Sequence, residues 1–149
     1  MRFTHIIGTV WLAEGHLLRG DRASPRPLID YVLATSRATG YRQFEGRACW
    51  LMAECLATEA PLSAEQHVEA AMRIFEEIGA RNDLARAMVT RAGLRQSAGD
   101  AAAARHLLDE AFRIFETLGT TDEQARVGQT LAALAEYFLK KLAKEGSVA

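Results

Sequence analysis

The chain has 149 residues, of which 49% are hydrophobic and 25% are charged, and its formal net charge at pH 7 is −1. A chain of this length is expected to fold as a single domain, residues 1–149, with a core of its own. The balanced charge gives no sign of the clustered basic excess that binding to nucleic-acid phosphates requires.

The first residues match neither a targeting signal nor a membrane segment. Arg2 is followed by a short apolar run, which Glu14 and His16 interrupt. A signal peptide needs a continuous apolar core with a small-residue cleavage site, and a membrane span needs about twenty apolar residues. We therefore expect a cytoplasmic protein that does not enter a membrane.

The spacing of apolar residues predicts helices along the whole chain. The second helix is expected to begin with Ser24 as its N-cap and Pro25 in its first turn. The fourth is expected to begin with Pro61 and with Ser63 and Gln66, which form a capping-box-like pair. The seven helices are predicted at residues 4–19, 25–40, 44–57, 61–78, 83–98, 101–118 and 122–144, and the last four residues are expected to fray.

An internal repeat organises the middle of the chain. Residues 71–79 and 111–119 carry nearly the same sequence, AMRIFEEIG and AFRIFETLG, at a shift of 40 residues. Gly40, Gly79 and Gly119 each close the second helix of a pair, at spacings of 39 and 40 residues. We expect Gly119 to take the left-handed conformation that commonly ends a helix. Repetition at this period is typical of helix pairs that stack into a solenoid, so the chain is expected to be all-α.

A set of mostly small and apolar residues recurs in the three helix pairs. The positions are Ala92, Gly99, Ala104, Leu108 and Ala111 in the third pair, Ala53, Ala64, Val68 and Ala71 in the second and, more loosely, Ala13, Gly20, Pro25, Ile29 and Val32 in the first. This pattern resembles a tetratricopeptide repeat array, a family that has small residues where the two helices of a pair cross and a glycine in the turn between them. The resemblance implies a right-handed α-α superhelix of three helix pairs, residues 4–40, 41–79 and 80–119, with a capping helix at about 122–144.

The chain departs from the family pattern in several places. Glu59 stands where the second pair should have a turn glycine, Arg95 replaces the usual aromatic, and no unit is closed by proline. The period also exceeds the family's usual length of about 34 residues, which implies longer helices. Such long units are similar to the tails of large bacterial signalling proteins that carry cyclase, ATPase or transcription-activator modules. The resemblance implies binding to other proteins or peptides.

The sequence contains no motif of a catalytic or metal site. It has no glycine-rich phosphate loop and no HExxH, CxxC or GxSxG. His5 and His16 share a helix but lie about three turns apart, and His67 and His106 fall on different helices. A metal site would need two ligands one helical turn apart. We therefore expect a protein that is not an enzyme and that holds no cofactor and no metal.

The two cysteines are expected to be structural. Cys49 and Cys55 fall on one predicted helix, separated by about 9 Å along its axis. That separation is too large for a disulfide between them. Isolated thiols within a helix are most often small core residues.

The resemblance places the first helix of each pair along a concave groove, and one residue type repeats there in register. Arg47, Arg86 and Arg126 each fall seven residues after the glycine that ends the preceding pair. A row of guanidinium groups would suit an acidic segment or a C-terminal carboxylate, because each can grip a carboxylate at two points. Alternatively, these arginines lie over neighbouring helices and pair with acids such as Glu45 or Glu54.

Four further residues are candidates for the wall of this groove. Trp50 lies one turn from the arginine row and could anchor a partner side chain, although a role in the core would explain it equally well. Glu54, Gln96 and Gln129 complete a wall of mixed character. The asparagines that accompany basic residues in carboxylate-gripping members of the family are absent.

The two end helices differ in how their apolar residues are arranged. The last helix is predicted to cap the stack with one apolar side formed by Leu131, Leu134, Tyr137, Phe138 and Leu142. The first helix spreads its apolar residues too widely for packing on one side only. We expect it to contact a second subunit, or an upstream domain, through Ile6, Ile7, Val10 and Trp11.

The sequence therefore predicts a non-enzymatic scaffold or adaptor that holds a protein or peptide, possibly acidic in character, in a concave groove. Two alternatives stay open, which are a regulatory module that senses a small peptide and the detached tail of a signalling ATPase, cyclase or transcription regulator. A catalytic helical bundle would require inward-facing pairs of carboxylates and histidines, and the sequence offers none.

Overall fold

The computed structural model describes residues 2–146, and within that range the backbone forms seven α-helices and no strand. The helices are α1 (Arg2–Leu18), α2 (Arg26–Thr39), α3 (Arg42–Leu56), α4 (Pro61–Glu77), α5 (Arg81–Ser97), α6 (Ala101–Leu118) and α7 (Thr121–Gly146). The predicted helices are confirmed, with bounds that move by one or two residues. None of the helices in this range is long and apolar enough to cross a membrane.

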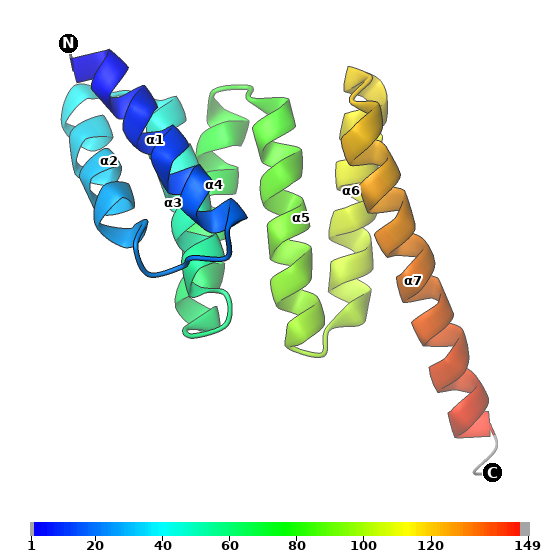
Figure 1. Ribbon diagram of the computed structural model, residues 1–149. Helices are drawn as coiled ribbons and strands as arrows, with labels where there is room; N and C mark the ends of the chain where they lie inside the picture. Colours follow the sequence, from blue (N-terminus) through cyan, green and yellow to red (C-terminus); the bar gives the residue numbers. More distant parts are fainter. Residues whose placement is uncertain (1, 147–149) are drawn as a thin grey trace.

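Consecutive helices pack against each other and run in alternating directions across the molecule (Figure 1). α3 also touches α1 and α5, which are not its neighbours in the sequence. α3 therefore lies between α1 and α5 along one side of the molecule. Because the connecting turns have only a few residues, each helix runs back beside the preceding one.

The helices end in the same way at equivalent positions. Gly40, Gly79 and Gly119 have φ angles of 75°, 71° and 72°, which confirms the left-handed conformation expected at Gly119. In each case the next amide donates to a carbonyl five residues back, as Thr120 N does to Phe115 O at 3.1 Å. This bond satisfies a carbonyl that the end of a helix would otherwise leave unpaired.

The repeat in the sequence is also a repeat in burial. Residues 71–80 and 111–120 show the same order of buried, half-buried and exposed positions, residue by residue. Phe75 and Phe115 occupy corresponding places and are 0% and 1% exposed. The two segments therefore have equivalent surroundings, although they lie in different helices.

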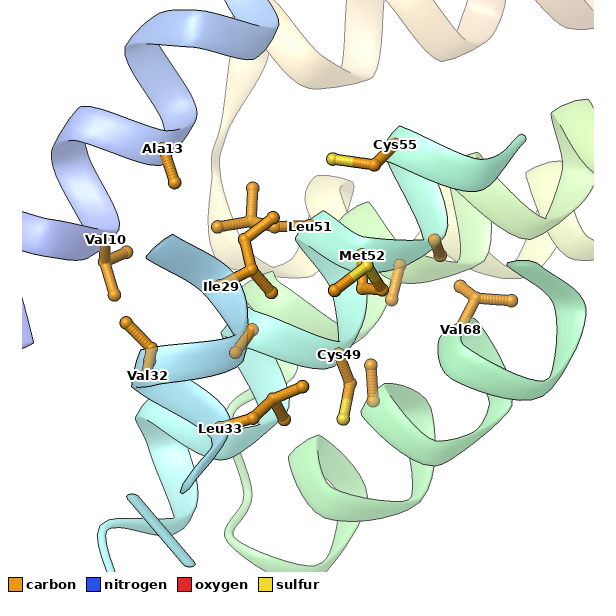
Figure 2. Close-up of a cluster of buried hydrophobic side chains, with 14 of the residues drawn as sticks. Val10, Ala13, Ile29, Val32, Leu33, Cys49, Leu51, Met52, Cys55 and Val68 are labelled. Atoms are coloured by element: carbon orange, nitrogen blue, oxygen red, sulfur yellow. The ribbon is translucent and has the colours of Figure 1, made fainter. Parts of the chain in front are cut away.

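A core cluster surrounds α3, which α1, α2 and α4 cover (Figure 2). Cys49 and Cys55 point into it with 1% exposure each, and neither forms a disulfide, which confirms that they are core residues. Burial raises the pKa of both thiols, because the charged thiolate is disfavoured away from water. A second cluster joins α5, α6 and the first half of α7.

Two predicted side-chain caps were wrong. Ser24 does not cap α2, whose N-cap is Pro25; the turn before it is held by Asp21, whose carboxylate accepts from the amide of Ser24 at 3.0 Å. α4 begins at Pro61, one of the residues predicted at its start, so Ser63 lies within the helix and does not cap it. A proline in the first turn loses no helical hydrogen bond, so Pro61 starts the helix without a side-chain cap.

The expectation for α1 needs correction. Ile6 and Val10 are 0% and 1% exposed and belong to the core of this chain, so they are not available to another subunit. Ile7 is half-buried, and only Trp11, at 66% exposure, lies largely open. The helix spreads its apolar residues widely because α2 and α3 both pack against it.

The expectation for the last helix holds only in part. Leu134 is buried, and Leu131 and Phe138 are half-buried. Tyr137 and Leu142 are 55% and 63% exposed, so they do not belong to the packed side. α7 continues through Gly146, which was expected to fray, and residues 147–149 lie outside the described part of the chain.

Candidate binding groove

Two adjoining hollows lie along the side formed by α1, α3, α5 and α7. The one nearer α7 has a volume of about 210 Å³ and is lined by Trp50, Glu54, Arg86, Val89, Thr90, Phe115, Glu123, Arg126 and Val127. The one nearer α1 has a volume of about 300 Å³ and is lined by Glu14, Leu17, Leu18, Trp50, Leu51, Glu54 and Arg86. Trp50, Glu54 and Arg86 line both, so the two hollows form one continuous groove, here called the groove.

A chain of hydrogen bonds crosses the centre of the groove from α3 to α5 and back. The indole Nε1 of Trp50 donates to Thr90 Oγ1 at 2.7 Å. Thr90 Oγ1 in turn donates to Glu54 Oε1 at 2.6 Å. Trp50 is half-buried, and this hydrogen bond fixes its ring as the floor of the groove. Thr90 was not foreseen as part of the site.

Arg86 lies over that floor. Its guanidinium carbon is 5.1 Å from the centre of the Trp50 ring, within the range of a cation–π interaction. No carboxylate among residues 3–146 forms an ion pair with this guanidinium. Its donors therefore remain available to a ligand in the groove, while the ring of Trp50 lies beneath the guanidinium.

Arg47 follows the second interpretation of the arginine row, in which these side chains pair with acids of neighbouring helices, although with an acid that was not named. It forms an ion pair with Glu14 of α1, and the two side chains are 20% and 27% exposed. Neither of the acids considered as its partner is used, since Glu45 pairs with Arg37 and Arg42 instead. Arg47 lines neither hollow. The charged group of Arg47 therefore joins α3 to α1.

Arg126 is the most open of the three arginines. It lines the α7 end of the groove and is exposed, and no ion pair involves it within the described residues. The repeat explains why. Glu14, Glu54 and Gly93 occupy equivalent places in α1, α3 and α5, at spacings of 40 and 39 residues. The repeat therefore sets Gly93 against Arg126 at the place that corresponds to Glu14 for Arg47, so the equivalent position offers Arg126 no acid.

The remaining predicted wall residues are not part of the groove. Gln96 lines a separate hollow of about 180 Å³ beside Leu134 and Tyr137. Gln129 is exposed on α7 and lines neither hollow of the groove. Glu123, by contrast, lines the α7 end of the groove and was missed, because nothing in its local sequence distinguishes it from other acids in the first turn of a helix.

The groove has mixed charge and an apolar floor. At its α7 end two acids, Glu54 and Glu123, stand beside two arginines, Arg86 and Arg126. No group of three or more histidine, cysteine, aspartate or glutamate side chains in the described chain is arranged to hold a metal ion. The side chains present can bind a ligand by ion pairing and by apolar contact.

Comparisons with known proteins add no family to this description. No model of a known protein family matches this chain, and no curated protein matches it either. The likeness to tetratricopeptide arrays therefore rests on the residues and the geometry given above, and it stays a prediction.

Proposed function

We propose that the chain is a tetratricopeptide-like, right-handed stack of three helix pairs followed by α7, and that it acts as a non-enzymatic scaffold for a segment of another protein. The observation that carries the proposal is the groove, whose wall is built by α1, α3, α5 and α7 in succession. A stack of equivalent units produces a continuous surface of this kind, and such surfaces are typical binding sites of repeat proteins.

The side chains at the α7 end of the groove favour a bound segment that contains an acidic residue. Arg86 and Arg126 line the same hollow, and neither guanidinium is neutralised by an ion pair within the described residues. A carboxylate there would gain charge-assisted hydrogen bonds from a group that is always protonated. An apolar side chain of the same segment would rest on Trp50, since fixed aromatic rings are frequent anchors at interfaces.

The proposal is tested by selecting a binder and then changing the groove. A random peptide library displayed on phage is selected on the intact chain, and an enriched peptide is synthesised and titrated by calorimetry. We expect enriched peptides to contain Asp or Glu beside an apolar residue. Arg126→Glu should weaken binding by about tenfold or more, because it replaces an attractive charge with a repulsive one.

Two variants control for effects outside the groove. Arg113→Glu reverses a charge on an exposed residue of α6 that lines neither hollow, so it should leave the affinity unchanged. Arg47→Ala should lower stability more than affinity, because Arg47 pairs with Glu14. Equal affinities for the wild type and for Arg126→Glu, or a selection that enriches no peptide, would refute the proposal.

A further inference from the structure

α7 exposes a face that α5 and α3 bury. In α5, Ala85 and Ala92 are 0% and 1% exposed, and both belong to the cluster shared with α6. Met88 lies between them and packs against the same cluster. The equivalent positions in α3 are also buried, at Gly46, Cys49 and Ala53. In both helices, therefore, these small positions are where the next helix packs.

A shift of 40 residues carries this face of α5 onto α7, at Ala125, Gly128 and Ala132. Ala125 and Ala132 are exposed there, and Gly128 is half-buried beside Phe112. The same line continues along α7 at alternating steps of three and four residues, which keep to one side of a helix. These residues are here called the α7 seam: Ala125, Gly128, Ala132, Ala135, Leu139 and Leu142.

The last part of the seam has no counterpart in the rest of the chain. α7 has 26 residues and α5 has 17. Figure 1 shows α7 running on past the turn between α5 and α6. Leu139 and Leu142 lie in this extension and are 67% and 63% exposed. The extension therefore adds two large apolar residues to the line on which Ala125 and Ala132 are also exposed.

We propose that the α7 seam is the contact surface between two copies of this chain, whose α7 helices pair in antiparallel orientation. Antiparallel pairing about the middle of the seam sets each large residue opposite a small one. The opposed pairs are Ala125 with Leu142, Gly128 with Leu139, and Ala132 with Ala135. Helices approach closely and pack without voids when large side chains enter the spaces left by small ones.

The charges at the two ends of α7 favour the antiparallel orientation. The start of α7 carries Asp122, Glu123 and Arg126, a net charge of −1, while its end carries Lys140, Lys141, Lys144 and Glu145, a net charge of +2. Antiparallel pairing brings the acidic end of each helix beside the lysine-bearing end of the other. Parallel pairing would place like charges together at both ends, which costs affinity. The self-complementary pattern is also what a two-fold symmetric contact requires.

Dimerisation through the seam leaves the groove open. Arg126 is offset from Ala125 by about 100° around the helix axis, and it lines the groove rather than the seam. The dimer therefore carries two grooves, and the proposal does not depend on what they bind.

The oligomeric state tests the proposal directly. Light scattering of the intact chain at micromolar concentration should give twice the monomer mass of 16.4 kDa. Leu139→Glu combined with Leu142→Glu should give the monomer mass with unchanged helical circular dichroism, because both residues are exposed. Leu62→Glu, at a residue of α4 that is 83% exposed, should remain dimeric. Trp11→Glu should also remain dimeric, which separates the seam from the exposed side of α1.

The orientation is tested by cross-linking. On oxidation, Ala132→Cys combined with Ala135→Cys should form a disulfide between copies. Ala125→Cys alone should not, because in antiparallel pairing it lies about 25 Å from the same residue of the other copy. A monomeric wild type, a dimer that only Trp11→Glu dissociates, or efficient cross-linking by Ala125→Cys alone would overturn the proposal.

Discussion

α5 and α7 occupy equivalent places in the repeat, yet they are held very differently. At the junction of α4 and α5, Arg91 pairs with Glu65 and with Glu69 at 2.6 Å each, and Arg95 pairs with Glu65 at 2.7 Å. At the junction of α6 and α7, Leu131 stands at the position equivalent to Arg91. The same position therefore holds an ion-pair network in the middle of the chain and an apolar contact near its end.

The other side of each helix shows the same contrast. Ala92 of α5 is 1% exposed beneath α6, while its equivalent in α7, Ala132, is exposed. α5 is thus packed on both sides, and α7 of an isolated chain is packed on one. The stability of stacked repeats is approximately the sum of their internal and interfacial terms. Substitutions in the middle of the chain should therefore change the free energy of unfolding more than substitutions in α7. The predictions below use that difference.

The largest effect is expected from a core residue of the middle region. Phe75→Ala should lower the free energy of unfolding by about 3–5 kcal/mol, because the side chain is fully buried and leaves a cavity. Tyr137→Ala, at a residue of α7 that is 55% exposed, should change it by less than about 1 kcal/mol. Urea unfolding of both variants checks this, and similar losses for the two would remove the contrast.

A pair of glycines within helices tests close packing. A Cβ atom on Gly46 would lie 2.7 Å from Phe75 Cε1, so Gly46→Ala should destabilise the protein by about 1–3 kcal/mol. Gly93 of α5 has nothing within 4 Å of the added atom. Gly93→Ala should therefore stabilise the protein by about 0.5–1 kcal/mol, because alanine has the higher helix propensity. Thermal unfolding of the two variants should show shifts of opposite sign, and shifts of the same sign would contradict the packing of α3 on α4.

The ion-pair network of the α4 and α5 junction should contribute a smaller amount. Glu65→Gln removes the charge that serves both Arg91 and Arg95, and we expect a loss of about 1 kcal/mol. Glu69→Gln is the matched control, because this side chain is 46% exposed whereas that of Glu65 is 17% exposed. Its effect should be near zero, as for most exposed ion pairs. Both variants are measured by urea unfolding. A larger loss of stability for Glu69→Gln than for Glu65→Gln would contradict the central role given to Glu65.

The smallest effect concerns the turn between α1 and α2. Hydrogen bonds from Ser24 hold the pKa of the Asp21 carboxyl at about 2, below the ordinary value of 3.8, and the hydroxyl of Ser24 has a larger effect than its amide. A lowered pKa stabilises the folded state above pH 3.8, and that contribution is lost as the pH falls toward 2. NMR titration should show this value in the wild type and a higher one in Ser24→Ala. Titration of wild-type Asp21 near 3.8 would contradict the turn geometry.

Much of the fold could be predicted because its signals are local. Gly40, Gly79 and Gly119 end helices through a backbone conformation that glycine adopts readily, so their spacing alone located three helix ends. The start of α4 was located only to within a few residues, because Pro61 and Ser63 are both good starting residues and only the structure decides between them. The length of α7 was predicted, but the exposure of Tyr137 and Leu142 was not, because the sequence does not show which apolar residues a neighbouring helix covers.

The candidate site was less predictable, because its contacts join helices that are distant in sequence. The repeat located the arginine row, but not its partners. Arg47 pairs with Glu14 because α1 touches α3, and Glu14 lies 33 residues away. Thr90 was missed for a similar reason. A threonine within a helix commonly bonds the carbonyl four residues back, as Thr130 does at 3.0 Å, and nothing local indicates that Thr90 also faces Trp50.

The account depends most on the groove as the surface that holds a partner segment. The direct measurement is an NMR titration of the labelled chain with a peptide enriched by selection, following backbone amides and the indole N–H of Trp50. That indole resonance should shift first, because its hydrogen bond to Thr90 lies at the centre of the groove. Shifts of the amides of Arg86 and Arg126 should accompany it, with little change in α2 and α4. Saturable shifts confined to α2, α4 or α6, with the Trp50 indole unmoved, would contradict the account.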